Sequence, residues 1–242
     1  MAWFGSITQM PLAVRMPEMR FSNRITIKDY WRMFKEHGVR LPFAYFIENH
    51  LFDFVHNIDT HRWLPKDQEI FASSNRDSGV LYMASWRSVI RESTRRAFAH
   101  CPRVKIQLVD IGCGKGKVLC VWEKMFKGKG DLEMIGVDYN PQLIKICKAN
   151  LEKIEAKHTR IYCEDITRFG SEIWEDGAIF FLYNPFDERI FRTFLTGLKN
   201  KNLTIIYVNP IYCDILLQFG FQIVQTKPSW HPTGSYSIFH RS

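Results

Sequence analysis

A run of alternating glycines carries the clearest chemical signal in the sequence. Residues 109–117 read VDIGCGKGK, in which Asp110 precedes Gly112, Gly114 and Gly116 in a D-x-G-x-G-x-G spacing. Glycines let a backbone turn tightly and approach a ligand where a Cβ atom would collide. The dinucleotide pattern G-x-G-x-x-G would need a third glycine at position 117, which is Lys117. The spacing indicates a ligand-binding turn of another kind, and a ligand-free strand-to-helix connection is the plainer alternative.

A second acidic residue follows the next apolar run, where Asp138 and Tyr139 come directly after Gly136-Val137. An acid in the crevice at the carboxyl ends of parallel strands can accept hydrogen bonds from both ribose hydroxyls. Asp138 is therefore the expected ribose ligand, and Tyr139 can pack on an adenine ring. Capping of a helix is the alternative role for such an aspartate.

An Asn-Pro-Phe sequence, Asn184 to Phe186, follows the apolar run 177–183. The Asn184 amide oxygen and the neighbouring carbonyls can accept hydrogen bonds from an N–H group, and Pro185 stiffens the turn that holds them. The pattern offers hydrogen-bond acceptors for a ligand that carries an N–H group. The structural alternative is that Pro185 only ends a strand and Asp187 caps the next helix.

These residues must be positioned by regular elements, and after residue 100 short apolar runs alternate with helical stretches. The runs lie at 105–110, 132–138, 160–164, 177–183 and 203–208. The helical stretches lie at 116–127, 141–155, 187–199 and 211–218. Such alternation predicts βαβ units and a parallel sheet covered on both faces. With closing strands at 221–225 and 236–240, the expected fold is an α/β, Rossmann-like sheet of seven mostly parallel strands.

Taken together, these motifs resemble those of class I S-adenosylmethionine-dependent methyltransferases. Over residues 79–242 the chain is similar to a mainly bacterial group of such enzymes, and its glycine motif also resembles that of the non-SET histone lysine methyltransferases. The resemblance implies S-adenosylmethionine as the cofactor. It implies that Asp165 accepts a hydrogen bond from the adenine amine and that Ile166 contacts the ring. The implied cofactor-binding residues are Asp110, Gly112, Cys113, Gly114, Gly116, Asp138, Tyr139, Asp165, Ile166 and Asn184.

The Asn-Pro-Phe sequence is similar to the Asn-Pro-Pro-Tyr/Phe motif of amino-group methyltransferases, although it is one residue shorter. This likeness implies catalytic roles for Asn184, Pro185 and Phe186 and transfer to a nitrogen of a protein, a nucleic acid or a small molecule. The competing hypotheses are a non-catalytic scaffold that binds the cofactor, an O-methyltransferase of a small metabolite with a histidine base such as His56 or His61, and a nicotinamide-dependent oxidoreductase. Lys117 disfavours the last of these.

Residues 1–78 differ in composition and pattern, because they are rich in aromatic and basic residues and lack the regular alternation seen later. Helices are expected at 27–36 and 43–54. They are interpreted as an N-terminal extension that forms a substrate lid over the strand ends of a domain spanning 79–242. That domain is expected to begin with one amphipathic helix from residue 79 to residue 100.

Two further clusters have plainer interpretations. The first cluster could offer oxygen and nitrogen ligands to a metal ion and consists of Asp53, His56, Asp59 and His61. Its spacing matches no metal-binding motif, so no metal is expected. The other is a basic stripe on the helix 79–100, formed by Arg87, Arg91 and Arg95. A solvated face is favoured for the stripe, and nucleic-acid phosphate is the alternative partner.

Composition limits the remaining possibilities for partners, membrane association and disulfide formation. The 242 residues include 33 Lys and Arg against 25 Asp and Glu, giving a net charge of +8 that excludes no partner. No run approaches the ~20 apolar residues of a membrane-spanning helix, so a cytoplasmic protein with no membrane partner is expected. Six cysteines without a Cys-x-x-Cys pair are expected to be reduced core residues.

Overall fold

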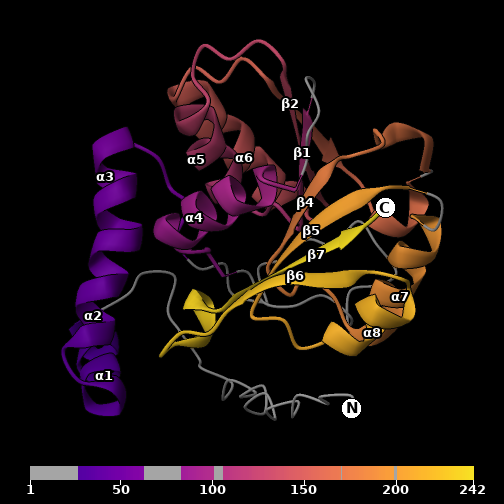
Figure 1. Cartoon of the computed structure of the whole chain (residues 1–242). Helices are drawn as coiled ribbons and strands as arrows, with labels where there is room; N and C mark the ends of the chain where they lie inside the picture. Colours follow the sequence, from indigo (N-terminus) through magenta and orange to yellow (C-terminus); the bar gives the residue numbers. More distant parts are fainter. Residues whose placement is uncertain (1–26, 63–82, 101–105, 170, 199–200) are drawn as a thin grey trace, which may run out of the picture.

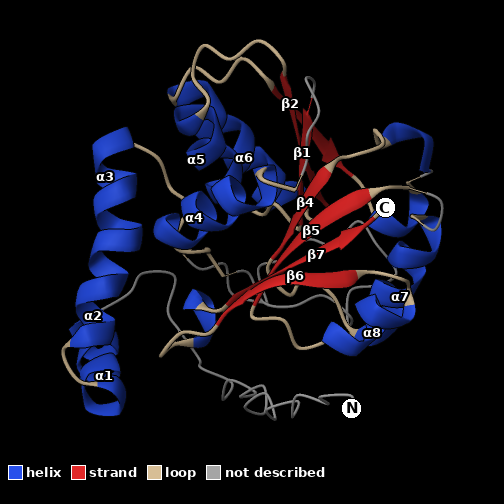
Figure 2. Cartoon of the chain, in the orientation of Figure 1, coloured by secondary structure: helices blue, strands red, loops and turns tan. Residues whose placement is uncertain are grey.

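A computed structural model describes residues 27–62, 83–100, 106–169, 171–198 and 201–242 (Figure 1). Its centre is a seven-stranded sheet whose alternation with helices follows the expected order (Figure 2). The strands are β1 (Ile106–Ile111), β2 (Leu132–Asp138), β3 (Thr159–Cys163), β4 (Ile179–Leu182), β5 (Leu203–Val208), β6 (Gln222–Lys227) and β7 (Tyr236–Arg241). The predicted α/β fold class is confirmed.

The strand order is β3-β2-β1-β4-β5-β7-β6. Strands β1 to β5 pair in parallel, and β7 pairs antiparallel with both β5 and β6, so the closing antiparallel pair is also confirmed. The chain leaves β1 toward β2 and β3 on one side and continues to β4 and β5 on the other. A crevice opens where the direction reverses, between the carboxyl ends of β1 and β4.

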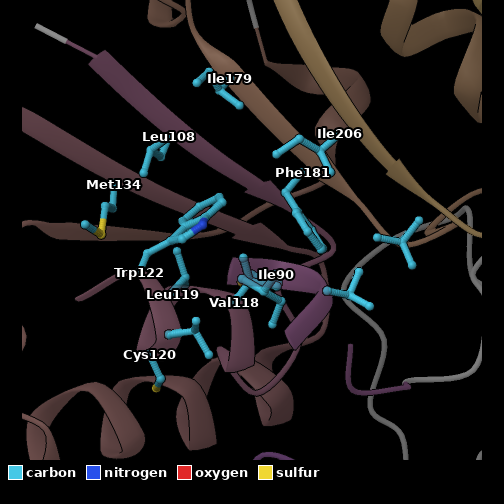
Figure 3. Close-up of a cluster of buried hydrophobic side chains, with 14 of the residues drawn as sticks. Ile90, Leu108, Val118, Leu119, Cys120, Trp122, Met134, Ile179, Phe181 and Ile206 are labelled. Carbon is cyan, nitrogen blue, oxygen red and sulfur yellow. The ribbon is translucent and has the colours of Figure 1, made fainter. Parts of the chain in front are cut away.

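Two layers of helices cover the sheet (Figure 1). On one face lie α4 (Arg87–Phe98), α5 (Lys117–Met125) and α6 (Pro141–Lys153), and on the other lie α7 (Glu188–Gly197) and α8 (Cys213–Gln218). Alternate residues of each strand supply the two cores. Leu108 and Phe181 pack with Trp122 under the first layer (Figure 3), whereas Val109 and Phe180 pack under the second.

The N-terminal helices form a rod beside the first helix layer (Figure 1). They are α1 (Ile27–His37), α2 (Arg40–Tyr45), the π-helix η1 (Phe46–Leu51) and α3 (Phe52–His56). Leu41, Phe52 and Ile58 from this segment belong to the same hydrophobic cluster as α4 and α5. The segment therefore packs onto the sheet domain, while the proposed boundary at residue 78 lies outside the described residues.

The expectation of one helix from residue 79 to residue 100 was wrong at its start. Residues 83–86 are not helical, and α4 begins at Arg87 because Trp86 has an extended backbone, with φ −70° and ψ 134°. Trp86 is buried and stacks on His231, with ring centroids 5.3 Å apart. This contact joins segments distant in sequence, and helical periodicity could not reveal it.

Of the expected core cysteines, Cys113, Cys120 and Cys147 are buried free thiols. Cys163 is exposed because β3 is an edge strand, which corrects that expectation, and Cys101 lies outside the described residues. None of the described helices has the length and apolar character needed to cross a bilayer.

Candidate cofactor and acceptor site

A pocket lies at the carboxyl ends of β1, β2, β4 and β5 and receives residues from each of the three motifs found in the sequence. Its wall also includes residues 83–85, which precede α4, and Asn209, which follows β5. The predicted site residues in its wall are Asp110, Gly112, Cys113, Asp138, Tyr139, Asn184 and Pro185.

The glycine turn between β1 and α5 is shaped by positions that no other residue could fill without strain. Gly112 has φ +73°, and a Cβ atom there would lie 2.7 Å from Pro185 Cβ. Gly116 has φ +81°, and its Cβ would lie 2.6 Å from Cys147 Sγ. The turn thus passes closely between the end of β4 and helix α6. Its backbone N–H groups at Gly112 and Cys113 donate to Val137 O, which ties it to the end of β2.

Asp138 is buried at the end of β2, with 7% of its surface exposed. Its Oδ2 accepts the Gly114 N–H and its Oδ1 accepts the Asn140 N–H, each at 2.8 Å. Burial raises the pKa of Asp138 to about 6, against the effect of these two backbone donors. Each carboxylate oxygen has a second lone pair with which it can accept a hydroxyl hydrogen. The capping role belongs instead to Asn140, which accepts from Gln142 N and Leu143 N at the start of α6.

Asp110 lies beside Asp138 in the same wall and is more deeply buried, at 3% exposed. Within the described part of the chain its Oδ2 has no hydrogen-bond partner. Burial and the neighbouring Asp138 hold the pKa of Asp110 well above its usual range. A buried carboxyl oxygen without a hydrogen-bond partner destabilises the fold unless a ligand supplies a donor. A cationic or N–H-bearing ligand would supply one at this position.

Asn184 lies just past the end of β4 in the left-handed region, with φ +49°. Its Oδ1 accepts a hydrogen bond from the Tyr207 hydroxyl at 2.8 Å. Because the Asn184 amide oxygen can only accept, the Tyr207 hydroxyl is the donor in this bond. Burial holds the pKa of the Tyr207 hydroxyl far above its usual value, so the hydroxyl keeps its hydrogen at neutral pH. This network fixes which end of the Asn184 amide faces Tyr207.

The remaining predicted site residues are placed differently. Asp165 accepts from Thr167 N and Thr167 Oγ1 as the cap of a short 3-10 helix, η4 (Ile166–Arg168), and neither Asp165 nor Ile166 is in the wall of the described pocket. Asp187 caps α7 by accepting from Ile190 N. Phe186 packs against Phe194 on the second helix layer. Asp165 and Asp187 therefore both act as helix caps. Adenine contact by Asp165 and Ile166 stays a prediction.

Two lysines of the glycine turn have a role that the sequence analysis missed. Lys115 and Lys117 are each 2% exposed, and both reach the N-terminal segment. Lys115 Nζ lies 3.2 Å from Asp59 Oδ2, and Lys117 Nζ donates to Glu48 O at 2.9 Å and lies 3.8 Å from Asp53 Oδ1. Burial lowers the pKa of Lys117 to about 8. The alternation of lysines with glycines in the turn was the one sequence feature that could have indicated this role. The partners of the two lysines lie more than 50 residues away in the sequence.

The Asp53, Asp59 and His61 side chains do come together, with one ligand atom of each within 4.8 Å of the others. Asp53 is already surrounded by donors, since it accepts from Thr60 N and Thr60 Oγ1 at 2.5 Å and contacts His61 Nδ1 at 2.6 Å. Burial opposes its ionisation, yet the bonds from His61 and Thr60 and the charge of Lys117 hold the pKa of Asp53 below its usual value. The arrangement is an ion-pair network that joins the N-terminal segment to the glycine turn.

The sequence was compared with models of known protein families. Residues 103–209 match a family model described as a methyltransferase domain. These residues form a methyltransferase domain. Its cofactor is therefore S-adenosylmethionine, and the matched range contains the glycine turn, Asp138, Asn184 and Asn209.

Solved structures with a similar fold include methyltransferases of several kinds. Magnesium protoporphyrin IX methyltransferase from Synechocystis PCC 6803, solved with bound SAM, is 14% identical with a TM-score of 0.49, over 64% of this chain and 79% of that one. Precorrin-6y C5,15-methyltransferase from Geobacter metallireducens GS-15 is 14% identical with a TM-score of 0.48, over 73% and 94%. Mitomycin 7-O-methyltransferase is 15% identical with a TM-score of 0.47, over 64% of this chain and 54% of that one. No curated protein matches the chain.

The pocket residues fit S-adenosylmethionine. Asp138 offers free lone pairs for ribose hydroxyls, and the unpartnered Asp110 oxygen suits the cationic methionine portion. The glycine turn leaves room that any Cβ at Gly112 would fill. Tyr139 contributes an aromatic ring to the same wall.

Proposed function

We propose that the protein transfers a methyl group from S-adenosylmethionine to a nitrogen atom of its substrate, with Asn184 orienting that nitrogen. The observation that carries the proposal is the position of Asn184-Pro185 in the same pocket wall as Asp110 and Asp138. The Asn184 amide is held in one orientation by Tyr207, so its remaining lone pair and the backbone carbonyls of the turn are acceptors for a substrate N–H.

The chemistry requires alignment more than acid–base groups. When bound, the cofactor supplies a methyl carbon activated by an adjacent sulfonium. Acceptance of the substrate N–H by Asn184 would direct the nitrogen lone pair toward that carbon for displacement of the sulfonium sulfur. The proton on the product nitrogen then leaves to water. Pro185 has no N–H group to compete for the carbonyl acceptors, and its ring limits movement of the turn.

Transfer to oxygen would call for a base near the substrate hydroxyl, and the two histidines considered for that role are elsewhere. Neither His56 nor His61 is in the wall of the described pocket. His61 contacts Asp53, and His56 packs against Phe52 with ring centroids 4.8 Å apart. Tyr183 is in the wall, but burial raises its pKa to about 12, which makes it a poor base at neutral pH. Nitrogen is therefore favoured over oxygen.

The test is transfer of a labelled methyl group from the cofactor into fractionated cell extract, with nuclease-treated and protease-treated portions beside it. The proposal expects a labelled product whose new methyl group is bonded to nitrogen, identified by mass spectrometry after hydrolysis. Label on oxygen or carbon would contradict the nitrogen assignment. Tight cofactor binding with no labelled product in any fraction would favour the scaffold hypothesis.

A further inference from the structure

The helices α1, α2, η1 and α3 form the N-terminal rod of Figure 1. Large apolar side chains are unusually exposed on this rod. Phe54 is 84% exposed, Phe43 64% and Trp31 58%. Nine of the fourteen exposed large hydrophobic residues of the described chain belong to this rod; they are Ile27, Trp31, Phe34, Val39, Phe43, Phe46, Leu51, Phe54 and Val55. An apolar surface of this density marks an interaction site.

The exposed residues are arranged as one face of each helix. On α1, Ile27, Trp31 and Phe34 recur at helical spacing, and Trp31 stacks on Phe34 with ring centroids 5.5 Å apart. On the continuous helical stretch from Arg40 to His56, the buried side faces the methyltransferase domain through Asn49 and Phe52. The opposite side carries the apolar face. This stretch is thus fastened to the domain on one side and exposes apolar residues on the other.

Basic residues border the apolar face. Lys28 and Lys35 are exposed, and at 100° per residue both fall on one flank of the Ile27, Trp31 and Phe34 stripe. Lys35 Nζ lies 5.7 Å from the centre of the Trp31 ring. Arg40 is exposed at the start of α2. Glu36 is the one exposed acid among the described residues of α1 and α2, so the border is positively charged.

We infer that this face lies on the surface of a membrane that contains anionic lipids. Helices with aromatic residues on one face and lysines or arginines beside them rest at the boundary between headgroups and acyl chains. The positive border distinguishes this occupant from a second copy of the chain, because two such borders would repel each other, whereas anionic headgroups attract them. Spanning a bilayer and lying on one have different requirements. The short apolar runs of the sequence exclude only a membrane-spanning helix, so the proposal replaces the expectation of no membrane partner with binding to a membrane surface.

The experiment is co-sedimentation of the full chain with phosphatidylcholine vesicles, with and without phosphatidylserine. The proposal expects binding to the anionic vesicles that weakens as salt rises and is much weaker on phosphatidylcholine alone. The double variant Trp31→Ser, Phe54→Ser should bind anionic vesicles at least ~10-fold more weakly, because both side chains are largely exposed and would supply apolar area to the bilayer. The variant Lys28→Glu, Lys35→Glu should lose the preference for anionic vesicles.

A matched control removes similar apolar surface from another part of the molecule. Leu217 on α8 and Ile223 on β6 are 45% and 42% exposed, and Leu217→Ser, Ile223→Ser should leave vesicle binding unchanged. All variants must retain the wild-type cofactor affinity, which shows that they are folded. Absence of binding to anionic vesicles would overturn the proposal. So would concentration-dependent dimers in the ultracentrifuge that the Trp31→Ser, Phe54→Ser variant abolishes, since the face would then join two copies of the chain.

Discussion

Asp138 must be ionised to accept two hydroxyl hydrogens, yet its surroundings oppose ionisation. Burial raises its pKa to about 6 from the ordinary 3.8, so the carboxylate is present above that pH and is protonated below it. The affinity for S-adenosylmethionine should therefore be constant near neutral pH and fall as the pH drops through about 6. Calorimetry across the range from about pH 5 to about pH 8 measures this. An affinity that does not change over that range would contradict ionised Asp138 as the ribose ligand.

Replacement of the same side chain tests the contact directly. Asp138→Ala removes the acceptors for two hydroxyls and should weaken cofactor binding by about 1–3 kcal/mol, or roughly 5- to 150-fold. Asp165→Ala is the informative comparison, because Asp165 caps η4 and is not in the pocket wall. A larger loss of affinity in Asp165→Ala than in Asp138→Ala would mean that the adenine contact implied by the family resemblance dominates binding.

Asn184 is assigned to the substrate rather than to cofactor affinity, and kinetics can separate the two. Asn184→Ala should leave the cofactor dissociation constant nearly unchanged and reduce turnover by about 10²-fold. Tyr207→Phe should lower turnover less, since it removes only the donor that orients the amide. Tyr162→Phe is the matched control, because Tyr162 packs against Phe169 and is not in the pocket wall. Full activity in Asn184→Ala would overturn the assignment.

At the scale of elements, the β1–α5 turn depends on contacts as well as on backbone freedom. Gly112→Ala places a methyl group against Pro185 at a positive φ, whereas Gly128→Ala, at φ +83°, meets nothing within 4 Å. Both variants incur the cost of a left-handed backbone, about 1 kcal/mol, but only Gly112→Ala should also displace the Asn184-Pro185 turn and lose cofactor affinity. Equal effects of the two variants on affinity would show that the close approach to Pro185 is unimportant.

The ion-pair network around Asp53 should contribute to stability because it is buried. Asp53→Ala removes the acceptor for Thr60 and His61 and leaves the Lys117 ammonium without its carboxylate. Breaking a buried pair in this way costs about 3–5 kcal/mol, which urea denaturation can measure. Glu188→Ala breaks the exposed pair with Arg192 and should change the free energy of unfolding by less than about 1 kcal/mol. Equal stability of both variants would contradict a structural role for the network.

These elements also show where reading the sequence succeeds. Strands β2 and β5 match their predicted bounds because continuous apolar runs between helical stretches leave few alternatives. The start of α4 was misplaced because stacking of Trp86 on His231 outweighs local helical preference. Likewise the ion pairs of Lys115 with Asp59 and of Lys117 with Asp53 join segments that are far apart in the sequence. Contacts between distant segments are what local patterns omit.

For the whole molecule, topology explains why motifs spread over about 100 residues meet in one pocket. The strand order changes direction between β1 and β4, so the carboxyl ends of β1, β2, β4 and β5 share one edge of the sheet. The sequence could place Asp110, Asp138 and Asn184 there because each follows a strand. It could not place residues 83–85 in the pocket wall, because their position depends on a non-helical segment packed against a distant loop.

The central claim, a pocket built for S-adenosylmethionine, is tested most directly by calorimetry of the full chain with three ligands. The account predicts saturable binding of S-adenosylmethionine and of its demethylated product S-adenosylhomocysteine, each to one site, and no binding of NAD. The turn with Lys117 in place of a third glycine lacks the pattern that accommodates a pyrophosphate. Binding of NAD in preference to S-adenosylmethionine, or no binding of either adenosyl compound by the folded protein, would contradict it.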